Sequence, residues 1–119
     1  MRRKTDLPEL LAPAGSMEAL YAAVEAGADA VYLGGKLYGA RAFAKNFDED
    51  GIRAAVRYCH LHGVRVYVTV NTLLFDKELS DALRYLHFLY EAGVDDIISA
   101  DLGLISLVRR QLPDLEIHA

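Results

Sequence analysis

Cysteine is nearly absent from this chain of 119 residues, and Cys59 is the only one. A single thiol excludes an internal disulfide, and it excludes a metal site or iron–sulfur cluster held by several cysteines of this chain. Glycine supplies only nine residues and proline three, which is too few for a fibrous or disordered chain. The composition is therefore that of a folded globular protein.

An excess of basic charge is also missing. The net charge of -4 argues against a domain that coats nucleic acid. The longest strongly apolar stretch, Val66 to Phe75, is about half of what a membrane span needs. The basic start at residues 1–4 resembles a signal peptide, but Asp6, Pro8 and Glu9 interrupt the apolar core that should follow. We therefore expect a cytoplasmic protein with no membrane partner.

Four helices are predicted by the residues that begin and end them. A serine or aspartate stands before each, where its side-chain oxygen can accept bonds from the unpaired N–H groups of the first turn. A glycine ends the first three, because glycine suits the left-handed backbone at a helix end, and a proline ends the fourth. The four segments lie between Ser16 and Gly27, Asp48 and Gly63, Asp76 and Gly93, and Asp101 and Pro113.

Apolar stripes support the second and third of these helices. Residues spaced three or four positions apart along a helix share one face and are expected to face a core. One stripe includes Cys59, which we therefore predict to be a buried thiol. The two stripes are Ile52, Ala55, Val56 and Cys59, and Leu79, Leu83, Leu86 and Tyr90.

Short apolar runs between the helices predict five strands. The order βαβαβαβαβ implies an α/β fold with parallel strands and right-handed helical crossovers. Residues 25–31 and 91–97 form a weak internal repeat, in which a helix end turns through glycine into a strand with Asp29 or Asp95 near its start. The strand-like runs are Glu9–Ala12, Ala30–Leu33, Val64–Asn71, Val94–Ser99 and Leu115–His118.

The third strand carries the most information about architecture. Valines at 64, 66, 68 and 70 alternate with Arg65, Tyr67, Thr69 and Asn71. In a barrel the valines would face the helices and the polar set would line the lumen, with Asn71 at the mouth where barrel enzymes keep their chemistry. The pattern favours the barrel, and an edge strand with one solvated face is the alternative.

The longest connection, Gly34 to Phe47, follows the second strand and contains Lys36, Tyr38 and Arg41, with no acidic residue before Asp48. Function in parallel α/β folds belongs at the carboxyl ends of the strands. A cationic connection there would suit an anionic ligand such as a carboxylate or phosphate. The alternative is a solvated loop.

Four further residues lie at or just after strand ends and complete the candidate substrate-binding set. Asn71 ends the third strand and Thr72 follows it, Asp101 follows the fourth strand, and His118 ends the fifth. His118 is a candidate ligand or catalytic group, whereas capping alone can explain Asp101. We predict no metal site and identify no catalytic residue.

Hydrolase signatures are missing from the sequence. Without a G-x-S-x-G motif, Ser16 is interpreted as a helix cap and not as a nucleophile. The sequence also has no H-E-x-x-H motif. His60 and His62 are two positions apart on a helix and point to different sides, so they cannot share a metal. Both histidines are predicted to lie at the surface.

Several ordered blocks resemble the collagenase-like peptidases of unknown catalytic type, family thirty-two. The resemblance implies an N-terminal β/α-barrel domain and the label of a peptidase. It also implies other activities, because some branches hydroxylate bases of ribosomal or transfer RNA or a quinone precursor, using an iron–sulfur cluster held by cysteines. The sequence of these blocks resembles the 23S ribosomal RNA cytidine hydroxylase branch. The matching blocks are residues 9–16, 27–35, 39–42, 68–73, 101–103 and 115–119.

Family members are several times longer, so the chain is interpreted as an N-terminal fragment. Residues 1–119 are expected to form an incomplete domain with about five of the eight strands of a TIM-like barrel, and residues 1–8 a flexible leader. No cofactor is expected within the fragment, since Cys59 alone cannot replace the cluster ligands, but the whole protein could hold the cluster.

Three functions remain open: a fragment of a peptidase, a fragment of an iron–sulfur RNA hydroxylase, and a non-catalytic half-barrel scaffold. The expected partners are the rest of the parent chain and, through it, RNA or peptide. An isolated half-barrel is also expected to self-associate, with Tyr67 and other lumen residues exposed to water.

Overall fold

The computed structural model describes residues 9–34, 47–70, 79–99 and 102–118. It confirms the predicted alternation of strands and helices in an α/β fold. The elements are β1 (Leu11–Pro13), α1 (Met17–Glu25), β2 (Ala30–Gly34), α2 (Glu49–Leu61), β3 (Arg65–Thr69), α3 (Leu79–Ala92), β4 (Asp96–Ile98), α4 (Leu102–Gln111) and β5 (Glu116–His118). The leader predicted at residues 1–8 lies outside the described residues.

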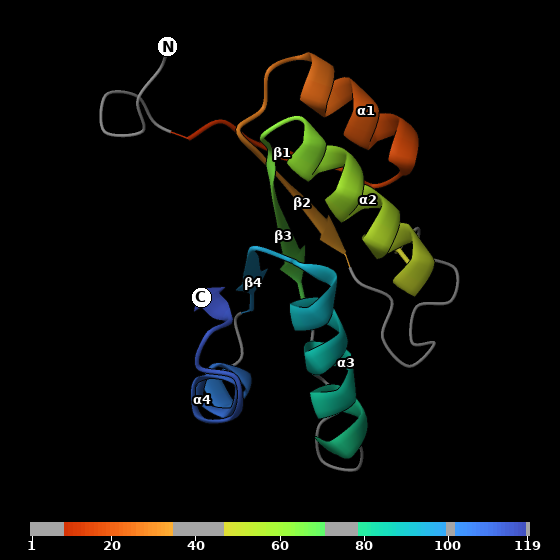
Figure 1. Ribbon diagram of the computed structural model, residues 1–119. Helices are drawn as coiled ribbons and strands as arrows, with labels where there is room; N and C mark the ends of the chain where they lie inside the picture. Colours follow the sequence, from red (N-terminus) through yellow and green to blue (C-terminus); the bar gives the residue numbers. More distant parts are fainter. Residues whose placement is uncertain (1–8, 35–46, 71–78, 100–101, 119) are drawn as a thin grey trace.

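The strands form one parallel sheet in chain order, β1-β2-β3-β4-β5. Each crossover advances in the same direction, so helices connected with one hand fall on one face of the sheet. Figure 1 shows the strands in succession with the helices beside them. This singly wound order differs from a doubly wound sheet, where the order reverses at a switch point.

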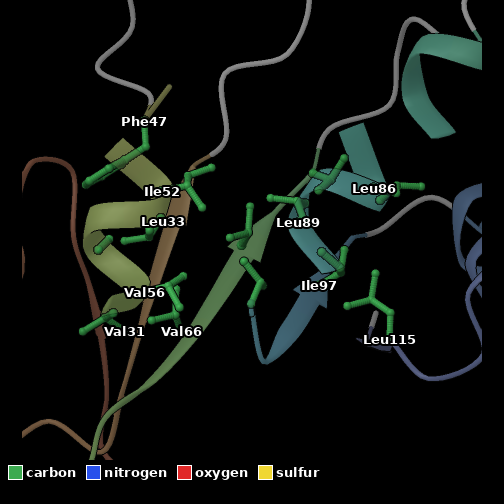
Figure 2. Close-up of a cluster of buried hydrophobic side chains, with 14 of the residues drawn as sticks. Val31, Leu33, Phe47, Ile52, Val56, Val66, Leu86, Leu89, Ile97 and Leu115 are labelled. Atoms are coloured by element: carbon green, nitrogen blue, oxygen red, sulfur yellow. The ribbon is translucent and has the colours of Figure 1, made fainter. Parts of the chain in front are cut away.

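The helix-covered face of the sheet holds the core. In β3, Val66 and Val68 are fully buried, and they align with Val31 and Leu33 of β2. Helix residues such as Ile52 and Leu89 pack against these strand residues (Figure 2). The valine half of the third-strand pattern therefore faces the helices, as predicted.

Helix boundaries follow the predicted chemistry where the structure describes them. Ser16 Oγ accepts a bond from Ala19 N at 3.1 Å, and Asp48 Oδ1 accepts one from Gly51 N at 2.7 Å. The predicted caps Asp76 and Asp101 lie outside the described residues. Both described caps confirm that local side-chain chemistry sets where these helices begin.

The glycine ends are alike in three helices. Gly27, Gly63 and Gly93 have φ values of 96°, 72° and 91°, in the left-handed region. The next residue donates its N–H to a carbonyl five positions earlier each time, for example Val64 N to Cys59 O at 2.8 Å. This 6→1 bond satisfies a carbonyl that the helix end would otherwise leave unpaired.

The stripe predicted for α2 is confirmed, because Ile52, Ala55, Val56 and Cys59 are its buried residues. The stripe predicted for α3 is wrong in part. Leu86 is buried, but Tyr90 is 41% exposed, and Tyr85 and Leu89 face the core instead. Apolar side chains occur almost all round the second half of α3, so spacing alone does not select the buried face.

Candidate functional site

In the sequence, the predicted site residues stand at or after the carboxyl ends of the strands. Gly34, Thr69, Ile98 and His118 occupy one row across β2 to β5. This row is the last one before the chain enters the segments that carry the other candidates. The described strand ends that lead into those segments therefore lie side by side at one edge.

Six of the seven candidate binding residues, Lys36, Tyr38, Arg41, Asn71, Thr72 and Asp101, lie outside the described residues. His118 ends β5 and pairs with Ile98, as expected for the end of the fifth strand. The connection that carries the cationic residues starts and ends at one point, because Phe47 N donates to Gly34 O at 3.0 Å. Its two ends are thus fixed together at the carboxyl edge.

Two residues earlier on each of these strands, a polar row crosses the sheet on the face turned away from the helices. Tyr32, Tyr67, Asp96 and Glu116 are in register on β2 to β5. Because side chains alternate along a strand, this row points away from Val66, Val68 and the helices. We call this side the polar face.

A cluster on the polar face joins β3 to Glu9, two residues before β1, and sequence reasoning missed it. The Tyr67 hydroxyl donates to the Glu9 carboxylate and lies 2.8 and 3.0 Å from its two oxygens, and Arg65 Nη2 donates to the same carboxylate at 2.6 Å. Tyr67 is only 8% exposed, which corrects the prediction that it is exposed to water: the clustered side chains remove it from solvent. The alternation of Arg65 and Tyr67 was the only signal in the sequence.

The Tyr67 hydroxyl is held as a neutral donor. Burial, and after it the hydrogen bond to Glu9, raises the pKa of Tyr67 to about 12, although the nearby Arg65 acts in the opposite direction. A phenol that keeps its proton to such a pH and already donates to a carboxylate is not poised as an acid or base near neutrality. We therefore assign this cluster a structural role: it links the chain just before β1 to β3, with β2 lying between the two strands.

Two aspartates of the internal repeat have one shared role. Asp29 Oδ2 accepts a bond from Leu10 N at 2.7 Å, and Asp95 Oδ2 accepts one from Val66 N at 2.7 Å. Each aspartate also donates its own N–H to the carbonyl of that same neighbour, at 2.8 and 2.9 Å. Each therefore binds both backbone groups of one residue: Val66 on β3 for Asp95, and Leu10, just before β1, for Asp29.

We call this pair of bonds between an aspartate and one backbone residue a clamp. In the Asp95 clamp the carboxylate has an additional partner, His60, whose Nε2 lies 2.7 Å from Asp95 Oδ2. His60 and His62 are both exposed, as predicted. His62 Nδ1 lies 2.8 Å from the carbonyl of Tyr58 in the same helix. The two histidines thus contact different groups, and the His60 contact lies at the amino-terminal edge, away from the candidate site.

Neither of the two residues weighed as nucleophiles from the sequence, Ser16 and Cys59, is placed for that chemistry. Ser16 is engaged as a helix cap, as predicted. Cys59 is fully buried, also as predicted, and burial, with a smaller effect of Asp95, raises the pKa of its thiol to about 11. Within the same described ranges, no group of three or more His, Cys, Asp and Glu side chains is placed to hold a metal ion.

The protection of Cys59 can be measured directly. A thiol reagent at pH 8 is expected to leave the native thiol unmodified and to modify it rapidly in denaturant, because the thiolate is the reactive form and the native group is buried. Labelling followed by mass spectrometry checks this. Rapid labelling of the native chain would show that the thiol is accessible and would contradict the buried assignment.

These features define a class: an α/β protein with a singly wound parallel sheet and its candidate ligand-binding segments at the carboxyl edge. Residues 15–119 match Peptidase family U32, and the chain belongs to that family. The resemblance found in the sequence is therefore confirmed.

Three relatives show the range of names within the family. The chain is 42% identical over 114 residues to tRNA hydroxylation protein P1 of Bacillus subtilis, covering 96% of this chain and 27% of the relative. It is 42% identical over 111 residues to the 23S rRNA 5-hydroxycytidine C2501 synthase of Escherichia coli, covering 93% and 16%. It is 36% identical over 96 residues to a collagenase of Porphyromonas gingivalis, covering 80% and 23%.

The chain thus spans between a sixth and about a quarter of these three relatives, which is consistent with a fragment. In the part that the structure describes, no helix has the length and apolar character to cross a membrane.

Proposed function

We propose that these residues belong to a protein that hydroxylates a base of RNA. The similarity to two relatives named for tRNA and 23S rRNA hydroxylation, each 42% identical over nearly the whole chain, carries the proposal. The parallel sheet supports it, because it provides a carboxyl edge of the kind that holds active sites in α/β folds. The cytoplasm, where such RNA resides, is the compartment we propose.

Residues 1–119 then form the N-terminal part of a TIM-like barrel with about eight strands. Strands in chain order and helices on one face are the arrangement that a barrel needs. The polar face, with the Tyr32–Tyr67–Asp96–Glu116 row, would line the lumen. The Glu9 cluster would then lie toward the amino-terminal end of the lumen, and ligands would enter from the carboxyl edge.

The seven candidate residues supply the contact with RNA in this proposal. Lys36 and Arg41 would pair with phosphate, and Tyr38 offers a ring for stacking on a base. Asn71, Thr72, Asp101 and His118 would provide hydrogen bonds at the adjoining strand ends. Fixing of both ends of the cationic connection at Gly34 and Phe47 supports this assignment.

An iron–sulfur cluster does not fit the residues of this chain. A cluster requires several thiolates, and Cys59 is single, fully buried and protonated. We propose that the cluster of the whole protein is held by residues outside these 119. No step of the reaction is therefore assigned to Cys59.

The peptidase reading remains a second proposal because one relative is named collagenase. It lacks support from Ser16 and Cys59, which are committed to a helix cap and to the core. A gelatin cleavage assay on the whole protein tests it, with a metal-free, protease-inhibited reaction as the blank. Cleavage above that blank would favour the peptidase reading.

Mass spectrometry of tRNA and ribosomal RNA from a strain lacking the whole gene tests the hydroxylation proposal. A hydroxylated base is expected to disappear, and the wild-type gene is expected to restore it. An unchanged profile would refute the function. Restoration with K36E/R41E should fail, whereas restoration with R109E/R110E, altered in the last turn of α4, should succeed. Full restoration by K36E/R41E would refute the site alone.

A further inference from the structure

A groove with a volume of about 390 Å³ is lined by side chains of both α2 and α3. Each helix contributes three residues at i, i+3 and i+4. The floor is apolar, since Val56 is 5% exposed and Ala92 is partly buried against the core. The six lining residues are Arg53, Val56, Arg57, Phe88, Glu91 and Ala92.

The charged walls of this groove differ in how far they are satisfied. Arg53 Nη1 pairs with Asp50 at 3.1 Å, and its guanidinium lies 4.8 Å from the centre of the Phe88 ring. Arg57 on α2 and Glu91 on α3 are both exposed. In the described part of the chain, neither of them has an ion-pair partner.

We propose that a second copy of this chain docks on the α2–α3 groove. Two copies related by a two-fold axis along the groove would face each other with α2 over α3. Arg57 of each copy would then meet Glu91 of the other, and the apolar floors would be covered together. A two-fold interface must be self-complementary in this way, because one patch meets itself. A cation on one wall and an anion on the other satisfy that condition.

The same charges disfavour nucleic acid as the occupant. A phosphate approaching Arg57 would also approach Glu91 on the facing wall of the groove. Phosphate binding instead needs an uninterrupted basic surface. The occupant that meets both charges is therefore protein, and the chain itself carries the matching pair.

The expected dimer is weak. Helices of 13 and 14 residues give a strip about 20 Å long, which is at the small end of specific interfaces. Sedimentation velocity of the 119-residue chain over a wide concentration range, up to about millimolar, should show a reversible monomer–dimer equilibrium.

Charge reversal tests the two-fold arrangement. R57E places two carboxylates opposite each other and E91R places two guanidinium groups so, and each should weaken the dimer roughly tenfold or more. The R57E/E91R double variant should dimerise like the wild type, and an equal mixture of R57E with E91R should form a heterodimer. R110E, on α4, is the control and should leave the equilibrium unchanged.

Two results would overturn the proposal. The first is a wild-type chain that stays monomeric throughout the concentration range. The second is association that R57E and E91R leave unchanged, which would point to the strand edges instead. Circular dichroism melts of every variant separate loss of association from loss of folding, and the mixture keeps the test decisive, since it needs no single variant to self-associate.

Discussion

Replacing Asp95 with alanine is expected to lower the free energy of unfolding by about 2–4 kcal/mol. The substitution removes the carboxylate that accepts from Val66 N and contacts His60. Val66 is fully buried, so its N–H would lose a charged acceptor in a place that water reaches poorly. Urea unfolding followed by circular dichroism measures the loss.

Three companion variants separate the parts of the Asp95 effect. D95N keeps an acceptor oxygen and should retain most of the stability. H60A removes only the exposed contact between the imidazole and Asp95 and should cost about 1 kcal/mol or less. D29A removes the equivalent clamp at Leu10, which is 50% exposed, so water can replace the lost acceptor and the cost should be about 1 kcal/mol. A D29A loss as large as that of D95A would contradict this account.

The sequence was sufficient for features that depend on neighbours in the chain. Ser16 and Asp48 cap helices whose first turns follow directly, and the three glycines end helices through bonds five residues long. The order of parallel strands follows from the same alternation, because a helical crossover allows few arrangements. The convergence of the candidate segments on one edge follows in turn from that order.

Contacts between distant residues could not be predicted in the same way. Asp95 was visible in the repeat, but its partner Val66 is 29 residues away. Glu9 lies 56 and 58 residues from Arg65 and Tyr67, so only the folded sheet brings them together. The prediction of the buried face of α3 was wrong in part for a related reason, since the surroundings of Tyr85 and Tyr90 decide which of them is buried.

The site combines both cases. Strand ends could be predicted from turn chemistry, and the position of His118 at the end of β5 was predicted in this way. The polar row behind that edge depends on strand register, because a one-residue shift would turn its side chains to the opposite face of the sheet. The roles of Tyr67 and its carboxylate partner therefore emerged only when β1, β2 and β3 were placed side by side.

Replacing Glu9 with alanine is expected to cost about 1.5–3 kcal/mol, because it leaves the buried Tyr67 hydroxyl without its acceptor and Arg65 without its ion pair. E9Q keeps an acceptor for Tyr67 and should cost less. In the E9A background, Y67F should cost little, since the hydroxyl has already lost its partner. Equal losses for Y67F in both backgrounds would show that the bond to Glu9 contributes nothing.

The same cluster makes stability fall at alkaline pH. Tyr67 has a pKa of about 12 in the folded chain against 10.0 ordinarily. Above pH 10 the unfolded chain releases this proton while the folded chain keeps it, so the folded state binds more protons and stability decreases as pH rises toward 12. The measurement is the difference between wild type and Y67F, which isolates the contribution of Tyr67. The urea midpoint should fall more steeply between pH 10 and 12 in the wild type, and parallel pH profiles would rule out the raised pKa of Tyr67.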